Sequence, residues 1–129
     1  MLTDARAMAI VPVSDRRRAI DFYTDTLGLR LLQETSQDIL LEAGGGTIVN
    51  LYESVGAGQS RHTLAAFMVD DIEATVRTLR GKGVDFEEYD LPEIKTVNGI
   101  AEMEGERAAW FRDPDGNIVA VAQRTASGH

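Results

Sequence analysis

The stretch "RDPDGNIVAVA", from Arg112 to Ala122, has the composition of a tight turn that leads into an apolar strand. An earlier stretch, "GGGTIVNLY" from Gly44 to Tyr52, has the same outline. When Gly46 is aligned with Gly116, "GTIVNLY" and "GNIVAVA" match at an offset of 70 residues. A turn and strand that occur twice indicate an internal repeat.

The repeat extends to a strand and a helix in each half. Val13-Ser14-Asp15 aligns with Val69-Asp70-Asp71 at an offset of 56. Each triplet closes an apolar strand, at residues 9–13 and 64–69, and supplies hydroxyl or carboxylate groups that cap the helix after it. The helices that follow are expected to bury residues three apart on one face and to end at glycine. The buried pairs are Ile20 with Tyr23 and Val76 with Leu79, and the glycines are Gly28 and Gly83.

Each half therefore reads as strand, helix, strand, strand, strand. "GLRL" from Gly28 pairs with "GVDF" from Gly83, and the later offset grows because residues 89–107 are an insertion in the second half. We expect a single domain made of repeat one (6–53), a linker (54–60) and repeat two (61–124). The linker, "SVGAGQS", has the glycine and serine content of a flexible connector.

The expected fold class is α+β: two βαβββ repeats that form a cupped open β-barrel with the helices on the outside. One helix covers only one face of a four-stranded sheet, so the other face stays open. Two such sheets placed side by side curve around a shared concave face.

Bulk properties exclude several kinds of partner. The 129 residues carry a net charge of −8, which disfavours nucleic acid because its phosphates would be repelled. No apolar run approaches the roughly 20 residues that a membrane helix needs. The chain has no cysteine and its first residues do not resemble a secretory signal, so a cytoplasmic location is expected.

Two motifs resemble those of the vicinal oxygen chelate superfamily. They are "VSDRRRAIDFYTDTLGLRLL" (13–32) in the first half and "WFRDPDGNIVAVAQ" (110–123) in the second. This superfamily contains glyoxalase I, extradiol dioxygenases, fosfomycin-resistance enzymes and bleomycin resistance proteins. The resemblance extends over roughly residues 6–123.

In enzymatic members, the resemblance implies a divalent metal held by four side chains, typically His, Glu or Gln, from the first and last strand of each half. The corresponding residues here are Met8, Asn50, Leu64 and Ala120. The internal repeat gives the same two pairs, at offsets of 56 and 70. Leu and Ala have no donor atom, a thioether suits soft ions, and a neutral amide is a weak donor. We therefore expect no metal and no other cofactor.

A shifted register does not restore a ligand set. A two-residue shift in the first strand of the second half (64–69) reaches His62, and a one-residue shift would turn side chains to the other face. No matching shift supplies two more ligands, and the only other histidine, His129, is the last residue.

Alternation along the strands assigns the residues of the concave face. This face is mostly apolar, which suits a hydrophobic or aromatic ligand, although its side chains alone could also fill the cavity. The expected ligand-binding residues are Met8, Ile10, Ile48, Asn50, Tyr52, His62, Leu64, Met68, Trp110 and Ala120, with Ala66, Ile118 and Ala122 beside them.

Four details stay open at the sequence level. Either Trp110 or Phe111 faces the cavity, and the other faces the core. Asn50, as a costly buried amide, orients a ligand or binds a water. His62 is either a surface residue or a candidate general base. The insertion is a lid over the cavity, with Leu91, Ile94 and Met103 turned inward, or a solvated hairpin.

Three functions are compatible with these features. The first is a metal-independent binding protein, a homodimer as the bleomycin-resistance precedent implies, that sequesters or carries a small hydrophobic molecule. The second is a metal-independent isomerase or lyase that uses His62, Glu93 or Lys95 as acid and base. The third, a metal-dependent glyoxalase or dioxygenase, lacks its ligands. The sequence favours the first, without catalysis.

Overall fold

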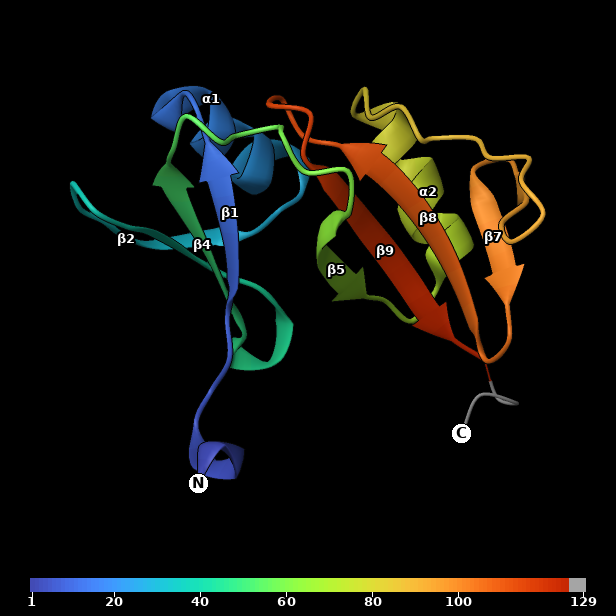
Figure 1. Ribbon diagram of the computed structural model, residues 1–129, viewed down its shortest axis with the longest axis horizontal. Helices are drawn as coiled ribbons and strands as arrows, with labels where there is room; N and C mark the ends of the chain where they lie inside the picture. Colours follow the sequence, from blue (N-terminus) through green and yellow to red (C-terminus); the bar gives the residue numbers. More distant parts are fainter. Residues whose placement is uncertain (126–129) are drawn as a thin grey trace. The chain divides into compact units, whose positions relative to one another are not determined.

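The computed structural model describes residues 1–125 of the chain (Figure 1). The chain divides into two compact units. Among the described residues, the first unit contains residues 1–64 and 113–117, and the second contains residues 65–112 and 118–125. Within the described part, no helix is both long enough and apolar enough to cross a membrane.

The first unit contains a four-stranded sheet, here called sheet 1, in the order β1-β4-β3-β2. β1 is parallel to β4, and the β4–β3 and β3–β2 pairs are antiparallel. Helix α1 packs against β4 and continues directly into the π-helical turn η2. The elements are η1 (Leu2–Asp4), β1 (Ala9–Val13), α1 (Arg16–Asp21), η2 (Phe22–Thr26), β2 (Arg30–Glu34), β3 (Ile39–Glu42), the 3-10 turn η3 (Gly44–Gly46) and β4 (Ile48–Glu53).

The second unit is built around a five-stranded sheet, sheet 2, in the order β5-β9-β8-β7-β6. The strands from β6 to β9 are antiparallel neighbours. Helix α2 packs on β8 and β9 and covers one face of this sheet (Figure 1). The elements are β5 (Thr63–Met68), α2 (Ile72–Gly81), β6 (Thr96–Val97), β7 (Ile100–Met103), β8 (Glu106–Arg112) and β9 (Ile118–Arg124).

The predicted α+β class is confirmed, since each half has a strand, a helix and a sheet that continues through later strands. One detail of the predicted repeat is wrong, namely the strand expected at residues 83–86. "GVDF" (83–86) makes a single bridge, between Phe86 and Phe111, and is not a full strand. Further along β8 the neighbouring strand is β7, which the insertion supplies. The insertion therefore completes sheet 2.

Both helices begin and end as the sequence predicts. The Asp15 carboxylate accepts a hydrogen bond from the Arg18 amide at 3.1 Å, and the Asp71 carboxylate accepts one from the Ala74 amide at 3.0 Å. These caps satisfy amides that lack an intrahelical partner. Gly28, which follows α1 and η2, has a φ of 81°, a conformation that side chains with a Cβ rarely adopt.

Each sheet buries the face that its helix covers. In sheet 1 that face carries Val11, Val13, Ile39, Leu41 and Leu51, all 0% exposed. Ile20 and Tyr23 from the helical segment are buried as well. In the second unit the buried set includes Ile72, Val76, Ala109, Phe111 and Val119.

The "DPDGN" turn at residues 113–117 is held by the buried carboxylate of Asp113. Its Oδ1 accepts hydrogen bonds from the amides of Asp115 and Asn117, both at 2.9 Å. Its Oδ2 accepts the hydroxyl of Tyr23 at 2.7 Å and the Asn117 side-chain amide at 2.9 Å. Burial, and secondarily the Asp113 charge, raise the pKa of Tyr23 far above its ordinary value, so its hydroxyl stays protonated.

Asn117, fully buried, connects this turn to β1 and to the linker. Its Nδ2 donates to the Pro12 carbonyl at 2.7 Å, and its Oδ1 accepts from the Gly58 amide at 3.0 Å. A Cβ at Gly58 would lie 2.1 Å from the Asp115 carbonyl oxygen. The linker is thus held in place at Gly58, where composition alone suggests a flexible connector.

Candidate functional site

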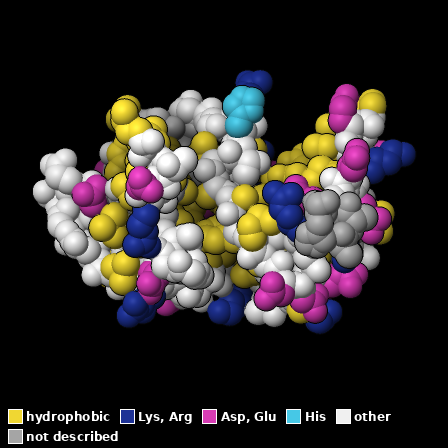
Figure 2. Space-filling view, turned by 90° about the horizontal axis from the view of Figure 1, so that it is seen from below, with side chains coloured by type: hydrophobic (Ala, Val, Ile, Leu, Met, Phe, Trp, Pro, Cys, Tyr) yellow, Lys and Arg dark blue, Asp and Glu magenta, His cyan; other side chains and the backbone are white. Residues whose placement is uncertain are grey.

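The face of sheet 1 opposite its helix, called the open face below, is apolar and exposed. The register sets Ile10 beside Asn50 and Pro12 beside Tyr52 across β1 and β4. Exposure is 47% for Met8, 52% for Ile10 and 38% for Tyr52, whereas Val11, Val49 and Leu51, which point to the helix side, are buried. On the side of the molecule seen in Figure 2, hydrophobic side chains are exposed between charged ones. Exposed apolar side chains of this size mark a surface that gains free energy when it is covered.

A groove of about 540 Å³ lies where this face meets the turn before β4. The Arg6 guanidinium donates to the Gly46 carbonyl and closes one side of it. The left-handed φ of 75° at Gly46, and the 3.1 Å from a Cβ there to Arg6, favour glycine at this position. Two of the predicted ligand-binding residues, Met8 and Ile48, line the groove together with Arg6, Ala7, Gly45, Gly46 and Thr47.

Asn50 is the polar residue at the centre of the open face. It is 6% exposed, and its Nδ2 donates to Asp38 Oδ1 at 2.9 Å. Its Oδ1 is buried and has no hydrogen-bond partner among the described residues. A buried acceptor without a donor raises the free energy of the fold, and natural proteins keep few of them.

The sequence predicts Asn50 as a site residue but gives no signal for Asp38. The two residues meet because β3 runs antiparallel to β4 and the register places Leu40 beside Asn50, with Asp38 just before β3. Because Ile39 and Leu41 alternate as buried residues, the sequence shows which side chains of β3 point to the helix side. The register of β3 against β4, however, depends on the length of the turn at residues 43–47. The sequence contained no independent signal for that register.

Sheet 2 also has a face away from its helix, and it carries Trp110. Trp110 pairs with Ala120 across β8 and β9, whereas Phe111 pairs with Val119 and is buried under α2. This resolves which aromatic side chain faces the core. The Trp110 ring stands edge-on to Tyr89, with ring centroids 5.6 Å apart. Two further predicted residues on these strands and on β5 are Met68, 56% exposed, and Ala120, 5% exposed.

The remaining predicted residues lie at the start of β5. His62 is exposed and precedes the strand, and its amide donates to the Ser60 hydroxyl at 3.1 Å. Leu64 is half-buried within the strand. Their roles as ligand contacts stay predictions.

The four positions that would hold a metal do not fit one. Leu64 and Ala120 have hydrocarbon side chains, and the Asn50 amide is already turned toward Asp38. Within residues 1–125, no cluster of three or more His, Cys, Asp and Glu side chains could hold a metal ion. A divalent catalytic metal requires at least three imidazole, carboxylate or thiolate donors, so we derive no reaction step through one.

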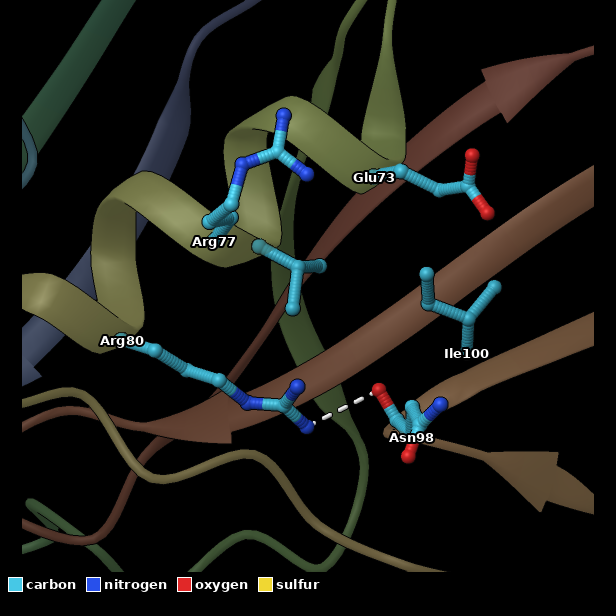
Figure 3. Close-up of a pocket in the computed structure, with 6 residues that line it drawn as sticks. Glu73, Arg77, Arg80, Asn98 and Ile100 are labelled. Atoms are coloured by element: carbon cyan, nitrogen blue, oxygen red, sulfur yellow. Dashed lines mark hydrogen bonds between the residues drawn. The ribbon is translucent and has the colours of Figure 1, made fainter.

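A second groove, of about 400 Å³, lies in the second unit between α2 and the β6–β7 hairpin (Figure 3). Arg80 points to the hairpin and donates to the Asn98 carbonyl at 2.8 Å, and its guanidinium lies 5.6 Å from the centre of the Phe86 ring. Arg77 projects from the same helix without reaching Asn98. The described contacts of Arg80 tie the helix to the hairpin, which is a structural role.

The insertion forms this hairpin. β6 and β7 are joined by Asn98 and Gly99, both with positive φ (54° and 81°), as a two-residue hairpin turn requires. Ala101 is fully buried, whereas Leu91 is 49% exposed. Residues 96–103 therefore extend sheet 2, and whether the remaining part of the insertion closes over a ligand stays a prediction.

The repeated βαβββ units, the "DPDGN" turn and the open sheet faces define a class of protein. The chain belongs to the Glyoxalase/Bleomycin resistance protein/Dioxygenase superfamily, whose family model matches residues 6–121. This confirms the family that the two motifs indicated.

Particular relatives are similar at moderate identity. The uncharacterized protein YraH of Bacillus subtilis (strain 168) is 29% identical in an alignment 126 residues long, and the match covers 84% of this chain and 90% of YraH. The crystal structure of TnmS3, an antibiotic binding protein from Streptomyces sp. CB03234, is 25% identical with a TM-score of 0.71, and the match covers 97% of this chain and 99% of TnmS3. A glyoxalase/bleomycin resistance protein from the same Streptomyces strain is 27% identical, with a TM-score of 0.66 and coverage of 91% and 98%.

Proposed function

We propose that this chain is a metal-independent small-molecule binding protein that sequesters or carries a hydrophobic or aromatic ligand. The observation that carries the proposal is the open face of sheet 1, where Met8, Ile10 and Tyr52 are exposed around the buried amide of Asn50. Covering apolar surface there contributes about 25 cal/mol per Å² removed from water. The similarity to an antibiotic binding protein supports the same class of function.

Two measurements on the purified protein test this proposal. Native mass spectrometry detects a ligand that co-purifies, and a thermal-shift screen with hydrophobic aromatic compounds detects ligands that bind the folded state. We expect an increase in melting temperature that EDTA does not change. If stabilisation by ligand appears only after a divalent metal is added, metal-independent binding is wrong.

We also propose that the protein works in the cytoplasm as a homodimer. Exposed apolar side chains outside the open face, at Leu31, Leu32 and Met68, are the kind of surface that a second copy covers. Sedimentation equilibrium at micromolar concentration gives the mass of the particle, for which we expect twice the chain's 14.1 kDa. A monomer at all concentrations contradicts this part of the proposal without affecting ligand binding.

A further inference from the structure

We propose that the ligand bound at the open face of sheet 1 presents a hydrogen-bond donor, preferably a protonated amine, to Asn50 Oδ1. This inference rests on the proposed binding function and specifies the chemistry of the ligand. The atoms that carry it are the buried oxygen of Asn50 and the carboxylate of Asp38.

The orientation of the Asn50 amide follows from its partner. An ionised carboxylate can only accept hydrogen bonds, so Asp38 must face the NH2 group of the amide. The observed 2.9 Å contact from Asn50 Nδ2 to Asp38 Oδ1 has this arrangement. The amide oxygen is therefore directed away from Asp38, and it can be satisfied only by an O–H or N–H donor.

Among the described residues, no group donates a hydrogen bond to this oxygen. The side chains beside Asn50 in the register are Ile10 and Leu40, and both are hydrocarbons. Ile10 is 52% exposed, and exposed side chains change rotamer within picoseconds to nanoseconds, so a ligand can displace it. Ile48, which lines the groove, is two residues from Asn50 on the same face of β4, roughly 7 Å along the strand. A small ligand in the groove can span this distance.

The charge of Asp38 favours a cation over a neutral donor. Arg30 pairs with Glu42 and Arg16 pairs with Glu34 and Glu53, whereas no described basic side chain pairs with Asp38. A carboxylate held beside the amide, in a partly buried position, attracts a positive charge that binds to the amide oxygen. A protonated amine supplies both the donor and the charge.

Three related probes separate these contributions: 1-naphthylmethylamine, 1-naphthalenemethanol and 1-methylnaphthalene. The three share a ring system and differ only in carrying a charged donor, a neutral donor or none. Calorimetric titration of the full chain should give the tightest dissociation constant for the amine, with the hydrocarbon about 10-fold weaker or more.

Two variants connect this ranking to the residues. Asn50→Leu should make the alcohol and the hydrocarbon bind alike, and should leave only the weaker preference for the amine that the charge of Asp38 gives. Without ligand, the melting temperature should change little, because removal of the buried unpaired acceptor offsets the lost hydrogen bond to the part-buried Asp38. Asp38→Asn should reduce the preference for the amine over the alcohol. Asp70→Asn, which removes one exposed charge in the second unit, is the matched control and should preserve the ranking.

Each outcome has a distinct meaning. Equal binding of the three probes to the wild-type chain overturns the inference and leaves the proposed binding function intact. A lower melting temperature for Asn50→Leu, with the ranking preserved, overturns it as well, because Asn50 would then be structural. Failure of all three probes to bind contradicts both the inference and the proposed function.

Discussion

Tyr23 and Asp113 are 90 residues apart in the sequence and share a buried hydrogen bond of 2.7 Å. The phenol is held neutral because burial and the neighbouring carboxylate both disfavour its anion. Asp113 also accepts bonds from the amides of its own turn, so this one carboxylate joins the "DPDGN" turn to the helical segment of the first unit. Within the described contacts, the "DPDGN" motif therefore has a structural role.

Tyr23→Phe tests this bond and its pH dependence. At neutral pH we expect a loss of about 1–3 kcal/mol, because Asp113 loses a buried donor. The folded pKa of Tyr23 lies above its unfolded value near 10, so its stabilisation is present below pH 10 and declines as pH rises further. Urea unfolding at pH 7 and at pH 11 should therefore show a smaller difference between variant and wild type at pH 11. A difference that does not change with pH would contradict this account.

Gly58→Ala tests the close approach of the linker to the turn. A Cβ at Gly58 would lie 2.1 Å from a backbone oxygen, whereas a Cβ at Gly28 would meet no atom within 4 Å. Both glycines have positive φ, so each alanine variant loses about 1–2 kcal/mol from backbone strain alone. Chemical denaturation should show a clearly larger loss for Gly58→Ala than for the Gly28→Ala control. Equal losses would mean that the linker moves away at little cost.

At the scale of elements, Arg80 makes a hydrogen bond from α2 to the β6–β7 hairpin. Its bond to the Asn98 carbonyl and its position over Phe86 connect helix, hairpin and the segment before the insertion. We expect Arg80→Ala to lower the hydrogen-exchange protection of residues 96–101. Arg77→Ala, in the same groove, is the control and should leave this protection unchanged. If both variants behave alike, Arg80 does not hold the hairpin.

The repeat predicted most elements because their signals are local. Asp15 and Asp71 cap the helices, Gly28 ends the first helical segment, and the apolar alternation gives the buried face of each sheet. The second half was harder to predict. "GVDF" has the composition of a strand, yet β7 is the strand that pairs with β8. Pairing between strands decides this position, and the local sequence does not show it.

The candidate site could be predicted only in part for the same reason. Alternation along β1 and β4 gave Met8, Ile10 and Asn50 from the sequence alone. Asp38 and Arg6 depend on pairing register and on a turn of three glycines, which no local pattern specifies. Pairing across β8 and β9 likewise decided between Trp110 and Phe111.

At the scale of the whole molecule, the net charge of −8 gives the chain a field that concentrates cations and repels anions. That field favours the protonated amine proposed as the ligand's donor, and the preference should weaken as ionic strength rises. The family, whose model matches residues 6–121, includes metal enzymes by name, but the residues at the four metal positions here lack the necessary donors. Members of a family share a fold, whereas the chemistry of each member depends on the residues at its site.

The most direct test of the account is a methyl NMR titration of the full chain, labelled at methionine and isoleucine, with 1-naphthylmethylamine in the presence of EDTA. The account predicts shifts at Met8, Ile10 and Ile48, with the methyl groups of Ile20 and Ile72, buried on the helix side, unaffected. Shifts confined to Ile100 in the groove beside α2, or shifts at the open face that require added divalent metal, would contradict it.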